Sequence, residues 1–399
     1  MDFTPTEEQR AAAGLAAEIF TDLSTPERLA ALGTSTDTEL WKALCAAGLP
    51  GAVEETGLLG LVLMLEEQGR TTAQVPFAVS CVYGLLAIGA HGSAEQRARL
   101  LPVLRDGAAV ATGAFPARPG GVRAERRAAG EGRLTGTVRV VPWLGDATHV
   151  LVPDAHETLW LVRTDGAGVG RDPVRTTAPW SAGRLTLDGA PAERLGGTPV
   201  ERLSGHAAYA DTLATARTAF AALQAGVCAG SLARAVAHTT TREQFGRPLS
   251  TNQGVLLRAA DAYMDTEAIR LTTYEAAWRR DAGLDARSHA LTAAWWASEA
   301  GTRVVHTGQH LHGGIGADID HPVHRHFLWG RQLDAYLGSG AQVLEELGQL
   351  LTTNKQENRD RQENRDRQEN RDRQENRDRH ENRDLGKNSH PRKNREETP

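Results

Sequence analysis

Two short stretches in the C-terminal half combine residue types that suit a phosphate group and a flat ring. The first stretch, 242–249, contains Arg242 and Phe245 and is followed by Gln253. An arginine at a helix end suits a pyrophosphate because its planar guanidinium can donate paired hydrogen bonds, and a neighbouring phenylalanine suits a planar ring. The second stretch, 310–316, contains Gly-Gly-x-Gly, which lets a backbone approach a phosphate or ribose closely. Taken alone, it also fits an ordinary glycine turn between helices.

Histidines gather around the second stretch and raise the alternative of a metal site. The spacings His-x-His and His-x-x-His-x-His could converge, but no cysteine or glutamate completes a known zinc pattern, so we predict no metal. The histidines in question are His306, His310, His312, His321, His324 and His326.

Carboxylates offer further candidate sites. Asp261, Asp265 and Glu267 fall within two helical turns, and pairing with Arg258 and Arg270 on the same helix is favoured over a catalytic pair. Two acidic residues after the glycine turn, Asp318 and Asp320, could serve as bases. The Trp295-Trp296 pair indicates buried packing rather than ligand stacking.

Composition limits the possible partners and compartment. A net charge of −5 excludes a globally basic nucleic-acid binder. Three well-separated cysteines, Cys45, Cys81 and Cys228, fit a reducing compartment, and no export signal precedes Glu7, so we expect a cytoplasmic protein. The uncharged segments 71–94 and 218–233 fall short of the ~20 strongly apolar residues that cross a bilayer, so we expect no membrane span.

The elements that position these residues predict an α+β fold that is mostly α. Residues 1–107 follow helical patterns, with a capping box at Thr4-Pro5-Thr6-Glu7. Residues 108–200 alternate apolar and polar positions between Gly/Pro/Asp clusters, which predicts a small antiparallel β domain. Residues 201–353 return to the helical period as a C-terminal bundle rich in alanine and glycine.

Residues 354–399 form a low-complexity tail. The sequence Gln-Glu-Asn-Arg-Asp-Arg occurs four times from Gln356 to Arg379. Such a segment has almost nothing apolar to bury and cannot offset its ordering entropy, so we predict disorder and assign it no chemistry.

The two stretches and the helical–β–helical order together resemble the acyl-CoA dehydrogenase family. The resemblance covers roughly residues 1–351 and implies FAD as cofactor, acyl-CoA as substrate and an electron-transfer flavoprotein or similar acceptor. In that family one subunit cradles the flavin ring while its neighbour supplies the arginine, phenylalanine and glycine pair. The cofactor-binding residues carried over are Arg242, Phe245, Gln253, His310, Gly313 and Gly314. Glutamine is more frequent in the family where His310 stands.

The family's catalytic glutamate has no counterpart in this chain. The resemblance places it either before Gly-Ser late in the bundle, where Leu337 stands, or before an arginine near the start of the first bundle helix, where Ala216 precedes Arg217. No catalytic residue is therefore expected, and Arg217 is expected to line the substrate pocket.

The β domain departs from the family too. Where a Trp-x-Thr run usually meets the flavin ring, residues 136–142 end in Pro142, which has no N–H to donate. The chain then resembles the partner subunit of heterotetrameric (two-plus-two) dehydrogenases of steroid side-chain acyl-CoA thioesters, paired with a homologous base-bearing subunit. A catalytically silent scaffold, or a different acyl-CoA reaction such as hydration or dehydration, are the alternatives.

Overall fold

The structure, a computed structural model, describes residues 2–115, 120–126, 130–196 and 205–353, with Gln356 and Gln368. The predicted disorder of the tail therefore falls outside the described residues, apart from those two. Met1–Glu345 form one compact unit and Glu346–Pro399 a second, in which residues 346–353 are helical. All further description concerns the first unit.

Helices make up the N-terminal region, as predicted. The capping box lies two residues later than expected: Thr6 caps α1 and pairs with Gln9, so Pro5 precedes the helix. Two short helices, α2 and α3, were not predicted. The elements are α1 (Glu7–Leu23), α2 (Pro26–Leu32), α3 (Thr38–Ala46), α4 (Leu49–Thr71), α5 (Phe77–Val79), the π-helix η1 (Ser80–Leu86), α6 (Ala87–His91) and α7 (Ala94–Arg105).

A seven-stranded sheet follows, in the order β1-β4-β5-β7-β3-β2 with β6 paired to β7. All pairs are antiparallel, as predicted, except β1 with β4, which is parallel. The strands are β1 (Ala111–Gly113), β2 (Val122–Arg126), β3 (Glu131–Val141), β4 (His149–Pro153), β5 (Leu159–Arg163), β6 (Val169–Pro173) and β7 (Gly183–Arg194).

A register shift in β3 changes which valines face the core. Val138 pairs with Leu185 and Val141 pairs with Gly183, so the two strands advance unequally between them. Such an irregularity reverses the inward and outward alternation of the strand. Val141 is therefore buried, whereas Val140 is 41% exposed, contrary to the simple alternation of Val138 with Val140.

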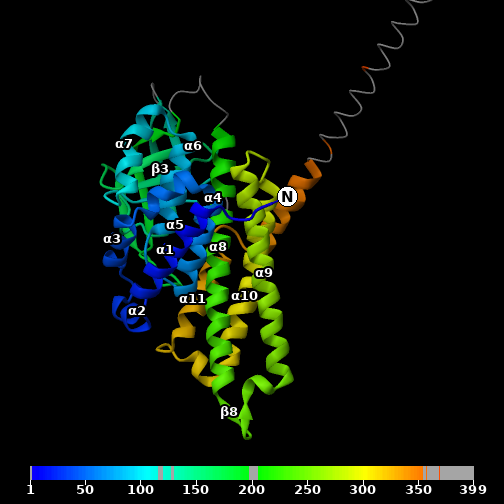
Figure 1. The fold of residues 1–399 in the computed structure, drawn as a ribbon. Coiled ribbons are helices and arrows are strands. Elements are labelled where there is room, and N and C mark those ends of the chain that lie inside the picture. Colours follow the sequence, from blue (N-terminus) through cyan, green and yellow to red (C-terminus); the bar gives the residue numbers. More distant parts are fainter. Residues whose placement is uncertain are drawn as a thin grey trace, which may run out of the picture. The chain divides into compact units, whose positions relative to one another are not determined.

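Three long helices form the C-terminal bundle (Figure 1): α8 (Gly205–Thr241), α9 (Gln253–Asp281) and α10 (Arg287–Leu311). A hairpin of β8 (Glu243–Gln244) and β9 (Arg247–Pro248) joins α8 to α9 and lies at the end of the bundle away from the sheet. The short helix η4 (Gly313–Ala317) and α11 (Pro322–Asp334) follow α10.

Glycines allow α4 and α8 to cross with their backbones in contact. A Cβ at Gly226 would overlap the Glu66 carbonyl, and a Cβ at Gly69 would overlap that of Leu223. Both helices therefore need glycine at the crossing. These two contacts explain why small residues are needed where the helices approach closely.

By length and composition alone, α8 could cross a membrane. The shorter segment 218–233, from which the sequence predicted no membrane span, lies within this helix. The window lies within Ala207–Thr241, and 72% of it is buried inside the protein. The bent pair Thr38–Ala46 and Leu49–Thr71 passes the same test as a broken span. Core helices of folded domains have these properties, and α8 packs against α4, α9, α10 and α11.

A side chain from α9 caps the second half of α4. Gly57 leaves the helical conformation with φ +71°, and the next two N–H groups, of Leu58 and Leu59, donate to Asp281 at 2.9 and 2.8 Å. Burial raises the pKa of Asp281, and the two backbone hydrogen bonds oppose that rise. The carboxylate therefore acts as a helix N-cap supplied from another helix.

Replacing this cap should destabilise the protein. We expect Asp281→Ala to lower the free energy of unfolding by about 1–2 kcal/mol, because two N–H groups lose their acceptor. Urea denaturation measures the change. The control is Asp172→Ala, which removes an exposed ion pair with Arg184 and should cost well under about 1 kcal/mol. Equal losses in both variants would contradict the cap.

Candidate functional site

The first stretch forms an exposed tip. Gln244 pairs with Arg247 across the hairpin, so Phe245 and Gly246 are its two turn residues, with φ of +55° and +73°. Two positive φ angles define a type I′ turn, which suits right-handed strand twist but strains a residue other than glycine. The ring of Phe245 is 100% exposed. Arg242 and Gln253 flank the hairpin and are also exposed.

The second stretch lies against the end of the helix that leads into this hairpin. The ring of His312, the last residue before the glycines, stacks on His238 of α8 with 4.7 Å between centroids. The N–H of Arg242 donates to the His238 carbonyl at 2.9 Å. The fold therefore brings the two stretches to the same end of the bundle.

The glycine turn presents an open backbone. Gly313 has φ +65°, and a Cβ placed at Gly313 or Gly314 would meet no atom within 4 Å. The Gln309 side-chain amide donates to the Gly316 carbonyl at 3.1 Å and so closes the turn. His310 is exposed at the end of α10.

These residues fit one side of a nucleotide-type cofactor. An exposed guanidinium, an exposed aromatic ring and an open glycine turn suit a pyrophosphate and a flat ring. They face away from the sheet, so a ligand that they hold must have its other side covered by something else.

Both expected base positions are apolar. Ala216 is fully buried and Leu337 is 8% exposed. The cavity beside Leu337 measures only about 20 Å³, and Arg217 lines it. Arg217 is buried within the N-terminal half of α8.

Aromatic side chains fill the space around these positions. The Tyr83 ring stacks on Phe115, which stacks on Tyr209, with centroid distances of 5.0 and 5.7 Å. The hydroxyls of Tyr83 and Tyr336 lie 3.1 Å apart, and burial raises the pKa of both phenols. Gly113 makes room for Tyr83, because a Cβ there would lie 2.5 Å from its ring.

A larger cavity of about 550 Å³ opens on the other side of Tyr336. Its lining includes Phe115, Val138 and Val140 together with the polar residues Thr137, Arg139 and Gln332. Pro142 is buried and is not part of the lining of this cavity, and its carbonyl accepts from the Thr112 hydroxyl at 2.6 Å. The cavity beside the β domain is therefore lined by both apolar and polar side chains.

The other candidate residues do not form sites. Among the described residues, no group of three or more His, Cys, Asp or Glu side chains could hold a metal ion. Asp265 pairs with Arg303 of α10 at 2.8 Å, not with a residue of its own helix, whereas Glu267 pairs with Arg270 as expected. Asp318 accepts from the Asp320 N–H at 3.0 Å in an exposed turn. Trp295 and Trp296 are half-buried.

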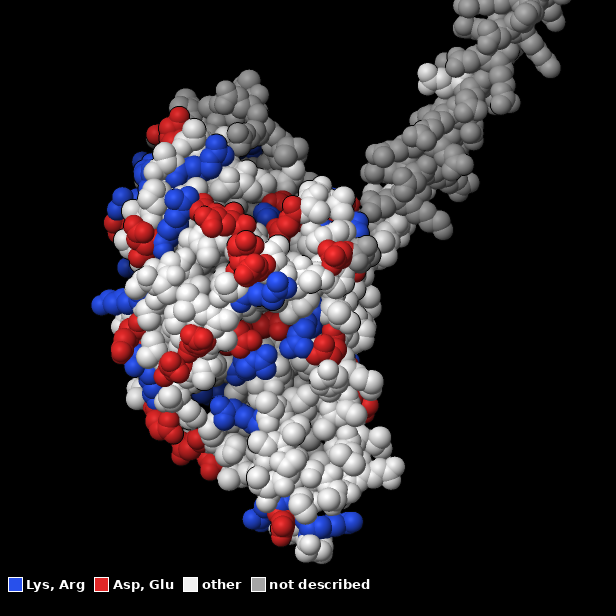
Figure 2. Space-filling model, in the orientation of Figure 1, with Lys and Arg blue, Asp and Glu red and all other residues white. Residues whose placement is uncertain are grey.

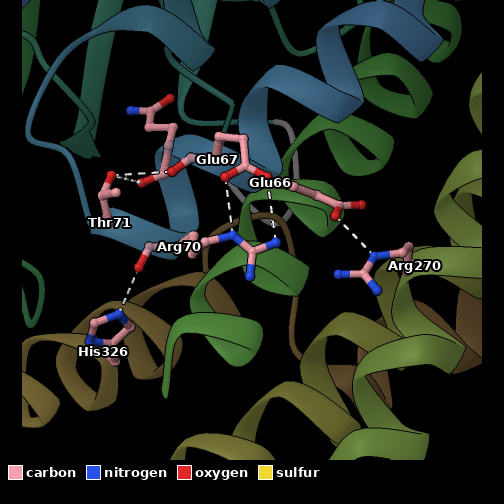
Figure 3. A network of polar contacts seen from close by, with 7 residues as sticks. Glu66, Glu67, Arg70, Thr71, Arg270 and His326 are labelled. Atoms are coloured by element: carbon pink, nitrogen blue, oxygen red, sulfur yellow. Dashed lines mark hydrogen bonds and ion pairs between the residues drawn. The ribbon is translucent and has the colours of Figure 1, made fainter. Parts of the chain in front are cut away.

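A buried polar network was not anticipated from the sequence (Figure 3). Glu66 of α4 accepts from Arg270 of α9 at 2.9 Å, and Arg70 pairs with Glu67 at 3.0 Å. His326 of α11 lies 3.0 Å from the Arg70 carbonyl, and burial lowers its pKa to about 4. Burial raises the pKa of Glu66, and Arg270 opposes that rise. The network joins three helices and commits Glu66 to an ion pair.

An N-terminal helical region, a small sheet and a C-terminal helical bundle follow one another in this order along the chain. Family models agree: residues 6–108 match the acyl-CoA dehydrogenase N-terminal domain and residues 204–350 the C-terminal domain. The chain belongs to the acyl-CoA dehydrogenase family of oxidoreductases. FAD is the cofactor of this family, and solved members of the fold bind FAD or FADH2.

Three members of the family are similar to this chain over nearly their whole length. Acyl-CoA dehydrogenase FadE27 of Mycobacterium tuberculosis is 37% identical over 88% of this chain and 99% of its own length. A variant of the Tcur3481–Tcur3483 steroid ACAD is 42% identical, with a TM-score of 0.82 over 87% of this chain and 98% of that chain. The ChsE4–ChsE5 complex from Mycobacterium tuberculosis is 34% identical, with a TM-score of 0.80 over 88% and 99%.

Proposed function

We propose that this chain is the base-free subunit of a heteromeric, FAD-dependent acyl-CoA dehydrogenase that desaturates an acyl-CoA thioester between the α and β carbons. A homologous subunit supplies the glutamate, and the assembly is a heterotetramer with two copies of each chain. An electron-transfer flavoprotein or similar acceptor receives the electrons. The compartment proposed is the cytoplasm.

One combination of observations carries the proposal. Both base positions are apolar and buried, yet Arg242, Phe245 and the glycine turn remain fully presented to solvent. Abstraction of a proton from the α carbon requires a base within hydrogen-bond reach. Ala216 and Leu337 cannot act as that base. The chain has therefore lost its own chemistry and kept the surface that serves a neighbour.

The surface of α9 supports assembly. Apolar and small side chains at helical spacing remain exposed along it, although the opposite side of the helix is already packed in the bundle. Figure 2 shows an almost uncharged surface over this part of the bundle. A continuous apolar surface of this kind marks a protein interface. The exposed residues are Leu256, Leu257, Ala260, Tyr263, Met264 and Leu271.

In the assembly each side chain has a definite task. Arg242 would hold the FAD pyrophosphate by a charge-assisted bond, and Phe245 would cover the adenine side. Gln253, His310, Gly313 and Gly314 would complete this half of the site. Bound FAD supplies the acceptor for the hydride that leaves the β carbon. Arg217 would border the substrate pocket.

A bulky, steroid-type acyl group is the proposed substrate. The support is the 42% identity to a structure described as a steroid ACAD, together with the cavity of about 550 Å³ beside Val138 and Val140. A small acyl chain needs no such additional space.

The visible spectrum tests the proposal. We expect the chain expressed alone to be colourless or poorly soluble, and the same chain co-expressed with a glutamate-bearing homologue to co-purify as a yellow heterotetramer. Absorbance near the flavin band after desalting measures FAD per tetramer. A soluble yellow homotetramer with one FAD per chain would overturn the proposal. A colourless heterotetramer would instead assign the chain to a silent scaffold role.

A further inference from the structure

Two guanidinium groups near the end of the bundle have no carboxylate partner among the described residues. Arg234 of α8 is half-buried and makes no polar contact with any described residue. Arg325 of α11 donates only to neutral acceptors: the Thr72 hydroxyl, the Thr72 carbonyl and the Gln74 side chain, at 2.8–3.3 Å. Buried cations are normally paired with a carboxylate, and neither of these two guanidinium groups has one among the described residues.

Histidines extend the same positive region. On α8, His238 lies one turn after Arg234; its ring stacks on His312, which contacts His321 with 4.9 Å between centroids. His312 Nδ1 is bonded to the Gly308 carbonyl at 2.7 Å, and His321 Nδ1 accepts from the Val323 N–H at 3.3 Å. The Nε2 atoms of both rings take part in no hydrogen bond within the described chain.

Burial and cationic neighbours lower the pKa values of two of these histidines, His312 and His321. Burial lowers the pKa of His312 most strongly, and His238, His321 and Arg234 lower it further, against the bond to Gly308. Burial, His238 and Arg234 also lower the pKa of His321, and only Asp318 raises it. His326 and Arg325 of α11 lie nearby, and burial lowers the pKa of Arg325 to about 10.

We propose that Arg234, His238, His312 and His321, here called the cationic cluster, bind a phosphate-type anion, and that binding takes up protons. Three elements contribute: the end of α8, the end of α10 and the loop before α11. His312 of the cluster immediately precedes Gly313 and Gly314 of the open turn. Phosphate is the ligand class that a guanidinium, imidazole N–H donors and an open glycine turn suit together.

The sign of the pH dependence follows from the charges. An anion favours the protonated forms of His312 and His321, whose pKa values are lowered in the free protein, and raises those pKa values toward or above the ordinary value of ~6.5. The bound state then holds more protons than the free state between about pH 5.5 and 7.5. Affinity should therefore rise as the pH falls, provided that the probe keeps a constant charge.

Sulfate is a suitable probe because it remains a dianion over this range, unlike phosphate. Isothermal titration of the full chain, co-expressed with its partner, is compared at pH 6.0 and 8.0. We expect about five- to tenfold tighter sulfate binding at pH 6.0 if the anion raises one histidine pKa by about 1.5 units. Arg234→Gln should weaken binding at least about tenfold at both values, and the double variant His312→Gln/His321→Gln should remove most of the pH dependence.

Matched variants separate this site from other effects. Arg234→Lys, which keeps the charge, should restore part of the affinity, and Arg303→Gln, an arginine already paired with Asp265, should change nothing. Competition with FAD identifies the source of the phosphate. If FAD-loaded complex excludes sulfate, the cofactor's own diphosphate occupies the cluster; if both bind, the natural ligand is a free anion.

Arg242→Ala keeps the test independent of the proposed function, because that substitution removes the expected FAD contact and leaves the cationic cluster intact. Sulfate should still bind this variant. Absence of sulfate binding at both pH values, or equal binding by wild type and Arg234→Gln, would overturn the proposal. The histidines would then be stacked neutral rings that only pack the helix ends.

Discussion

Arg242→Ala is expected to lower the affinity of the heteromeric complex for FAD ten- to hundredfold. The flavin pyrophosphate carries two negative charges, and a charge-assisted hydrogen bond contributes about 1.5–3 kcal/mol, with tenfold in affinity for each 1.4 kcal/mol. FAD per tetramer, measured by absorbance after desalting and by titration of the stripped complex, reports the loss. The effect would originate in a subunit that has no base of its own.

Conservative and neighbouring substitutions make this result specific. Arg242→Lys should recover only part of the affinity, because an ammonium group cannot reproduce the planar fork of guanidinium. Arg247→Ala removes an exposed arginine from the other strand of the same hairpin and should have the smaller effect, which controls for loss of surface charge. Equal FAD content in wild type and Arg242→Ala would mean that this residue does not hold the cofactor.

Gly226→Ala is expected to destabilise the protein by about 1–3 kcal/mol or more. The new methyl group would overlap the Glu66 carbonyl at the crossing of α4 and α8, so two packed backbones must separate. Separation would also disturb the buried ion pair of Glu66 with Arg270. Urea denaturation followed by circular dichroism measures the loss of unfolding free energy.

The control is the same substitution at an open helical position. Gly14 lies on the exposed side of α1, and a Cβ there meets nothing within 4 Å. Gly14→Ala should stabilise the protein by roughly 0.5–1 kcal/mol, since alanine is the better helix former. If both variants gained stability, the close crossing would not constrain the fold.

Local patterns in the sequence were sufficient for most of the architecture. Ser93 and Gln96 form the capping box that starts α7, and such a cap depends only on residues three apart in the sequence. Val140 could not be placed correctly, because the register shift in β3 is fixed by its pairing with β7. Asp281 as a cap for α4 was equally inaccessible, since it lies over two hundred residues away along the chain.

The candidate site also combines features that the local sequence indicates with features that it does not. Arg242, Phe245 and the glycine turn are contiguous motifs that the sequence identifies directly, and their role toward a second molecule stays a prediction. The hydroxyl pair of Tyr83 and Tyr336 joins residues from opposite halves of the chain, so no local pattern indicates it. The sequence indicated His312 and His321 among the possible metal ligands, whereas in the structure the His312 ring stacks on His238 and makes an edge contact with His321.

The exposed ring of Phe245 and the apolar surface of α9 also bear on the fate of an unassembled copy. Chaperones and proteases recognise exposed apolar surface, and a chain without its partner presents it in the fully folded state. The folded but unassembled chain would therefore remain a target of chaperones and proteases, and assembly would cover the apolar surface that they recognise. The steady-state amount of this chain should then follow the supply of its partner, so that removing the partner's gene lowers the protein level while the messenger level stays constant.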